Sequence, residues 1–194
     1  MTFFKKIFGK KLKSNKTDYD PEALYMWEDD YLMIELLPHE NLIFIQNETT
    51  RIDEFGEEHR EGMGFNDVTL IGEPPTKTIE KLIYEKQVID ILDHSGLSKI
   101  KKAYIQGVGI LTGDKAPLAY GSNKVAIMIE TKGTLIQHIW INGRTENNSD
   151  KDLLKKTLKQ IGSQFNFIAV DWFRTQYYDL SIASEVDKFV ENSC

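Results

Sequence analysis

Four histidines and one cysteine are the residues of this chain that could bind a transition metal. His39, His59, His94 and His138 include no pair at the H-x-x-x-H spacing, and the single cysteine is the last residue, Cys194. A zinc site needs several such ligands at short, defined spacings. The sequence therefore predicts no metal site. His138, in the middle of an apolar run, is interpreted as a structural or surface residue.

Motifs for nucleophilic catalysis or phosphate binding are also missing. No G-x-S-x-G is present, Gly107–Gly109 lies inside an apolar run, and Thr112–Pro117 lacks the phosphate-loop spacing. The carboxylates of Glu28, Asp29 and Asp30 could serve in acid–base chemistry, but nothing in the sequence fixes their separation. We therefore predict a non-enzymatic protein without a cofactor. A deep pocket that collects several acids with a histidine would favour an enzyme instead.

Charge is distributed unevenly along the 194 residues. Residues 1–16 contain six lysines and no acid, a charge of +6, and residues 18–61 contain fourteen acids and two arginines, a charge of −12. Residues 62–194 contain sixteen of each and balance to zero, which gives the net charge of −6. Such asymmetry says more about partners than about fold.

The acids of residues 18–61 are the strongest candidates for a binding surface. These acids flank predicted strands, and loops fixed at strand ends hold their charge in fixed positions, which suits recognition of a basic partner protein. Solubility alone is the simpler alternative. The predicted partner-binding residues are Asp53, Glu54, Glu57, Glu58 and Glu61, followed by Glu28, Asp29 and Asp30.

Aromatic residues lie among these acids. Tyr25, Trp27, Tyr31 and Phe55 would be anchors for a partner if they are exposed, and core residues if they are buried. Tyr31 is assigned to the core, and Trp27 is left open between the two.

The basic N-terminal segment, residues 1–16, is amphipathic on a helical wheel. Three hypotheses remain open: a short helix on an anionic membrane surface, a targeting signal recognised by another protein, or a frayed, solvated terminus whose phenylalanines dock on the body. Nucleic acid is not predicted as a partner, because the remainder of the chain is acidic. The residues that would contact a membrane are Phe3, Phe4, Ile7 and Phe8, with Lys5 and Lys6.

Residues 17–24 are predicted to form a linker, and residues 25–194 a single α+β domain with a largely antiparallel sheet and helices packed against it. The predicted helices are Thr76–His94 (one irregular helix or two short ones), Ser149–Ile161 capped by Ser149 and ended by Gly162, and Ile182–Val190. The predicted strands are Tyr31–Leu37, Leu42–Ile45, Thr49–Phe55, Val68–Ile71, Ala103–Leu111 with a bulge, Lys124–Thr131, Thr134–Asn142 and Phe165–Val170.

Sequence features also suggest a location. The longest apolar run, Val125–Ile129, is far too short to span a membrane, and no secretory signal is recognisable near the start. A lone cysteine cannot form an intrachain disulfide, which fits a reducing compartment. We expect a cytoplasmic protein, held at the inner face of the membrane if residues 1–13 bind anionic lipid.

The segment Phe165–Leu180 (FNFIAVDWFRTQYYDL) ends an apolar strand in Asp171-Trp172 and continues through aromatics to a final helix. In this segment, in size and in α+β order, the chain resembles immunity proteins of bacterial polymorphic toxin systems. The resemblance covers mainly residues 165–194 and transfers no binding residues. It implies a cytoplasmic protein that binds and blocks a cognate toxin, often a basic nuclease.

Two functional hypotheses follow. The first is an immunity-type inhibitor that covers a basic toxin with its acidic residues. The second is a membrane-peripheral accessory domain attached by its basic N-terminal segment.

Overall fold

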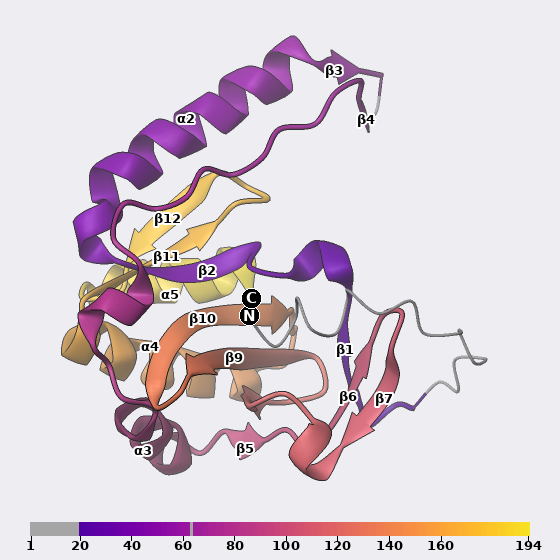
Figure 1. Cartoon of the computed structure of the whole chain (residues 1–194), viewed down its shortest axis with the longest axis vertical. Helices are drawn as coiled ribbons and strands as arrows, with labels where there is room; N and C mark the ends of the chain where they lie inside the picture. The colour runs from indigo at the N-terminus through magenta and orange to yellow at the C-terminus, as the bar shows by residue number, and fades with distance from the viewer. Residues whose placement is uncertain (1–19, 63) are drawn as a thin grey trace.

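The computed structural model describes residues 20–62 and 64–194. Within them a seven-stranded sheet forms the centre of the molecule (Figure 1), and every neighbouring pair of its strands is antiparallel. Its strands in spatial order are β12 (Gln176–Asp179), β11 (Phe167–Asp171), β2 (Ile34–Pro38), β10 (Leu135–Gly143), β9 (Val125–Lys132), β8 (Ala119–Gly121) and β5 (Ser98–Lys99). The predicted α+β class with a largely antiparallel sheet is confirmed.

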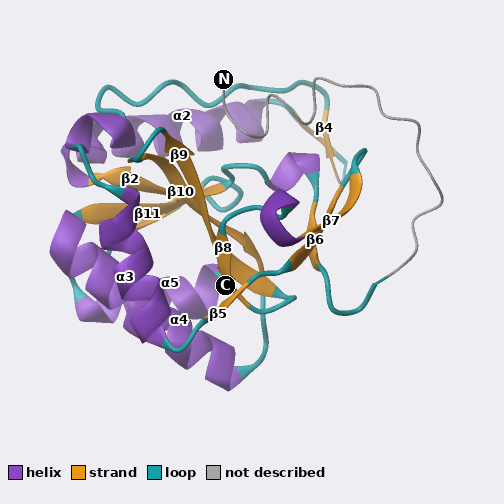
Figure 2. Cartoon of the chain, turned by 60° about the horizontal axis from the view of Figure 1, so that its bottom comes forward, coloured by secondary structure: helices purple, strands orange, loops and turns teal. Residues whose placement is uncertain are grey.

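One face of this sheet is covered by three helices, which lie together in Figure 2. Alternate residues of the central strands, such as Leu36, Ile127 and Ile139, point to these helices and are almost fully buried. The residues between them are buried as well, because the opposite face of the sheet is also covered. The helices are α3 (Glu85–Ser95), α4 (Asn148–Phe165) and α5 (Ala183–Ser193).

The opposite face is covered in two separate parts. Helix α2 (Leu42–Glu58) packs through Ile45 on Leu37, Ile168 and Trp172. A small sheet packs through Leu24 and other apolar residues on the β8–β9–β10 side. This small sheet consists of β1 (Leu24–Met26), β6 (Lys102–Ile105) and β7 (Gly109–Thr112).

The remaining elements are short. The two-stranded hairpin at the far end of α2 joins β3 (Arg60–Glu61) to β4 (Gly64–Phe65). The 3₁₀ turns are η1 (Glu28–Asp30), η2 (His39–Asn41), η3 (Thr78–Lys81) and η4 (Gly113–Lys115).

Helix α2 corrects the largest error of the sequence analysis. Leu42–Ile45 and Thr49–Phe55 are not strands, because both lie in this one helix. The run LIFI is rich in strand-forming residues, yet Ile43 is exposed while Ile45 is fully buried. Burial of one helical face against the sheet outweighs the local strand preference. The predicted strand Val68–Ile71 is also wrong, because this segment pairs with no strand of the described residues.

Other predictions hold with local changes. The Thr76–His94 region forms η3 and α3, and β9, β10 and β11 form near their predicted positions. Ala103–Leu111 is a hairpin of β6 and β7, not one bulged strand, because Gly107 and Gly109 take positive φ angles in its turn.

Helix α4 differs from its prediction at both ends. Its N-cap is Asn147, whose side chain accepts from the backbone N–H of Ser149 at 2.8 Å, so Ser149 is not the cap. Gly162 does not end the helix. A Cβ there would lie 2.1 Å from the carbonyl oxygen of Leu180, so the glycine allows a close approach of two chain segments.

The folded body extends five residues beyond the expected boundary at Tyr25. Asp20, at the start of the described residues, forms an ion pair with Lys102 at 2.9 Å, and Ala23 and Leu24 are buried. The second half of the predicted linker 17–24 therefore belongs to the fold.

Candidate functional site

The last turns of α2, the β3–β4 hairpin and the chain returning to Ile71 form a projection that we call the acidic arm (residues 52–62 and 64–71). Figure 1 shows α2 running away from the central sheet, with β3 and β4 at its far end. Between Asp53 and Glu61 the arm contains five acids and one arginine, a net charge of −4. These five acids are all exposed.

Helical spacing explains why the acids share one side of α2. Residues three and four apart are neighbours on a helix surface, so Asp53 lies beside Glu57 and Glu54 beside Glu58. The packing side of the helix carries Ile45, Thr49 and half-buried Ile52 instead. Glu54, Glu57 and Glu58 therefore point away from the sheet, whereas Asp53 lies at the border of the packing side, within reach of Thr175.

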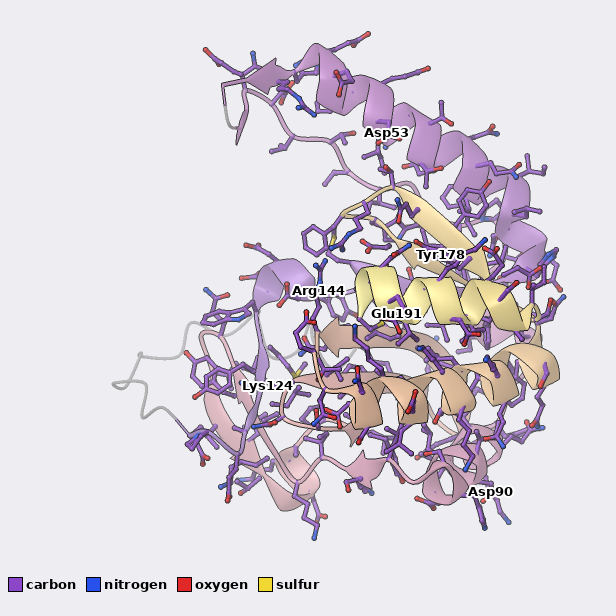
Figure 3. The ribbon with its side chains drawn as sticks, turned by 180° about the vertical axis from the view of Figure 1, so that it is seen from behind. Asp53, Asp90, Lys124, Arg144, Tyr178 and Glu191 are labelled. Atoms are coloured by element: carbon purple, nitrogen blue, oxygen red, sulfur yellow. The ribbon has the colours of Figure 1, made fainter. Side chains whose placement is uncertain are left out.

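Two of these five acids have partners within the chain. The hydroxyl of Thr175 donates to Oδ1 of Asp53 at 2.5 Å, and Figure 3 shows Asp53 on the side of α2 that faces the β11–β12 hairpin. Arg60 pairs with Glu57 at 3.1 Å, with both side chains largely exposed. Glu54, Glu58 and Glu61 have no hydrogen bond or ion pair from their side chains to any described residue.

This arrangement is electrostatically unfavourable for the isolated helix. The C-terminal end of a helix carries partial negative charge, and like charges four residues apart repel, by roughly a few tenths of a kcal/mol per pair. The last turn of α2 contains no basic residue that would compensate. A cationic partner would relieve this repulsion.

Exposed apolar side chains lie next to these acids. Val68 and Leu70, on the segment that returns along α2, are both 86% exposed. Arg51 holds this segment against the helix by donating to Oγ1 of Thr69 and to the carbonyl oxygen of Leu70, each at 2.7 Å. The arm thus combines fixed negative charge with apolar surface.

Arg51 is itself fixed by Glu48. Its guanidinium donates to both carboxylate oxygens of Glu48, at 2.9 and 2.7 Å, and these bonds lower the pKa of Glu48. The backbone N–H of Gly72 also donates to Glu48. The base of the acidic arm is therefore held by bidentate hydrogen bonds.

The other three predicted acids form a second group on a different element. Glu28 and Asp29 are exposed on η1, while Asp30 is half-buried and burial raises its pKa. Helix α2 begins beyond the end of β2 and runs back above the sheet, so its acidic end and η1 lie toward the same end of the molecule in Figure 1. The eight acids make two groups on separate elements.

The aromatic residues near the acids divide between surface and interior. Trp27 is 48% exposed, with its ring 6.1 Å from that of Tyr104. Tyr31 is half-buried and meets Trp140 edge to face at 5.5 Å between ring centroids. Phe55 stacks on His59 at 4.1 Å. Trp27 is thus the aromatic residue of this set that a partner could reach most easily.

A second polar feature, which the sequence analysis missed, crosses three neighbouring strands of the large sheet. Glu35 on β2, His138 on β10 and Glu130 on β9 lie in adjacent positions on the face opposite α3–α5; we call them the buried polar row. Nδ1 of His138 lies 3.1 Å from Oε1 of Glu35, and Tyr31 donates its hydroxyl hydrogen to Oε2 of Glu130 at 3.2 Å.

Burial controls the charge of this row. Desolvation raises the pKa of both Glu35 and Glu130, and His138 opposes the shift in each case. The only sequence signal for this row was a charged residue at an inward position of an apolar strand, as with Glu35 in YLMIELL. His138, interpreted as structural or surface, is a partly buried member of the row.

Several predicted features lie outside the described residues or find no counterpart within them. The membrane-contact residues Phe3, Phe4, Ile7, Phe8, Lys5 and Lys6 all fall in the undescribed part of the chain. Within residues 20–62 and 64–194, no group of three or more acids, histidines and cysteines is placed to hold a metal ion. No helix in the same residues is long and apolar enough to cross a membrane.

Comparisons of this chain with protein-family models, with curated proteins and with solved structures give no match.

Proposed function

We propose that this protein is a non-enzymatic, immunity-type inhibitor, which binds a basic cognate toxin through the acidic arm. The observation that carries the proposal is that the arm keeps four acids on the last turns of α2 and a fifth, Glu61, on β3, three of the five without a partner among the described residues. A helix tolerates such repulsion at a modest cost, and a cationic surface would turn it into a favourable contribution.

Inhibition would be steric and electrostatic. Fixed negative charge speeds the encounter with a basic protein and orients it. Val68 and Leu70 would then supply apolar contacts at the centre of the interface, within a charged rim. Residues of η1 would add to the negative field from a separate element, so they are proposed as secondary contacts.

The test uses the protein encoded by the gene next to this one, expressed as an inactive variant, and measures its affinity by calorimetry. We expect Glu54→Lys with Glu58→Lys to weaken binding at least tenfold, because two attractive contacts become repulsive. The matched control is Asp90→Lys with Asp114→Lys, which changes the net charge equally at exposed positions off the arm. Equal loss in the two variants would reject the arm as the binding surface.

The membrane-peripheral alternative rests on residues 1–13 and makes a different prediction. Flotation with phosphatidylserine vesicles would retain the full chain and lose a chain lacking residues 1–16. Binding of both forms to the neighbouring gene product with equal affinity would favour the inhibitor.

A further inference from the structure

A cavity of about 260 Å³ lies where the segment before β8 meets the ends of β9 and β10. Its wall is mainly apolar, formed by Pro117, Leu118, Met128 and Trp140 among others. Glu130 is the one ionisable side chain of this wall within the described residues. The cavity is thus an apolar space with a single carboxyl group, the composition typical of small-ligand sites.

The carboxyl group of Glu130 is held in place but incompletely satisfied. The residue is 5% exposed, and Tyr31 donates to its Oε2 at 3.2 Å. Its Oε1 is buried and has no hydrogen-bond partner among the described residues. Buried polar atoms are nearly always paired, so this oxygen is an open acceptor that a ligand with a donor group would satisfy.

Charge around Glu130 favours a cation. Burial disfavours a negative charge on Glu130 most strongly, His138 favours that charge, and Glu35, the second carboxyl group of the buried polar row, repels it. Nδ1 of His138 is hydrogen-bonded to Oε1 of Glu35 at 3.1 Å. A ligand that carries positive charge would therefore offset the cost of burying the Glu130 carboxylate.

The chemistry of the wall narrows the class of cation. Tyr31 occupies one carboxylate oxygen, whereas a guanidinium binds best to both. A hydrated metal ion would need further oxygen ligands, and no cluster of three acids, histidines and cysteines is placed to hold one in the described residues. The indole of Trp140 offers an aromatic surface that attracts ammonium groups.

We propose that this cavity binds a small primary ammonium compound, with its charged nitrogen at Oε1 of Glu130 and its apolar body against Leu118, Met128 and Trp140. The site is separate from the acidic arm and does not depend on the proposed inhibitor function. Tyr31 is its positioning residue, because its hydroxyl directs the free oxygen of Glu130.

The experiment is a titration of the full-length, ¹⁵N-labelled protein followed by NMR, with n-butylammonium chloride as the probe and n-butanol as a neutral probe of the same length. We expect saturable shifts at residues of the wall for butylammonium, and binding of butanol at least about tenfold weaker, the scale of one hydrogen bond to a charged group. Equal affinities for butylammonium and butanol, or chemical shifts that change without saturating, would overturn the proposal. This part of the experiment needs only the unsubstituted protein.

Variants then locate the site. Glu130→Gln keeps the size of the side chain and should weaken butylammonium binding at least about tenfold. Glu58→Gln, the same change on the exposed acidic arm, should leave it unaltered. If Glu58→Gln weakens binding as much as Glu130→Gln, the probe binds the acidic surface in general, and the cavity is not its site.

Discussion

The acidic arm and the buried polar row use the same carboxyl groups in opposite surroundings. On the arm the acids are exposed, and three have no partner among the described residues. In the row, Glu35 and Glu130 are buried, and each has a hydrogen-bond partner on another segment of the chain. Exposed acids cost the fold little and remain available to another protein, whereas buried acids cost more and require fixed neighbours.

The largest effect should come from removing a partner within the buried polar row. His138→Ala leaves the carboxyl group of Glu35 buried without its hydrogen bond, and should lower the free energy of unfolding by about 1–3 kcal/mol. His94→Ala, at an exposed histidine, should change it by less than about 0.5 kcal/mol. Urea denaturation of both variants measures the difference. Equal losses of unfolding free energy would show that the buried polar row stabilises the fold no more than an exposed histidine does.

A smaller effect is expected in the pH dependence of stability. Burial raises the pKa of Glu130 above its ordinary value of 4.5, so the folded state holds its proton to higher pH than the unfolded state. Stability from this group is complete below pH 4.5 and is lost as pH rises through the raised pKa.

Glu130→Gln removes this loss. The free energy of unfolding of the variant, relative to that of the unsubstituted protein, should therefore be higher at pH 7.5 than at pH 4. This gain should be smaller than the loss that His138→Ala causes, and urea unfolding at both pH values measures it. Comparing the two pH values cancels any effect of the glutamine side chain on stability that does not depend on pH. A gain that is absent, or of opposite sign, would show that folding does not raise the pKa of Glu130.

One exposed contact joins the outer part of α2 to the turn between β11 and β12. Asp53→Ala removes the acceptor for Thr175, and should destabilise the protein by about 0.5–1 kcal/mol. Hydrogen exchange should become faster in α2 from Ile52 onward. Glu54→Ala is the matched control, because Glu54 has no such contact in the described residues, and similar exchange in both variants would contradict a role of Asp53 in positioning the arm.

The smallest effect concerns the stability of the free arm. Glu54→Lys with Glu58→Lys exchanges one like-charge pair for another but places two cations at the negative end of α2, so thermal unfolding should show a gain of roughly a few tenths of a kcal/mol. A clear loss of stability would mean that these acids support the fold. The binding argument for them would then lose its basis.

Sequence patterns predicted the elements whose local preference agrees with their packing. The β9–β10 hairpin, α3, α4 and β11 are of this kind. Helix α2 could not be predicted, because its LIFI run is typical of a strand and the sheet face that it covers is assembled from distant segments. The five acids from Asp53 to Glu61 are exposed, but four of them lie on this helix and not beside strands.

The buried polar row was beyond prediction for a different reason. Its residues come together only through strand register, with His138 opposite Glu130 and Trp140 opposite Glu35. A bulge between Ile136 and His138 also breaks the simple alternation of faces in β10. A single sequence gives neither register nor bulge.

The central claim is that the acidic arm attracts a basic protein, and the association rate with the neighbouring gene product at several salt concentrations tests it most directly. The account predicts fast association that slows steeply with added salt, and a much weaker salt dependence for Glu54→Lys with Glu58→Lys than for Asp90→Lys with Asp114→Lys. The same salt dependence in both variants would contradict it.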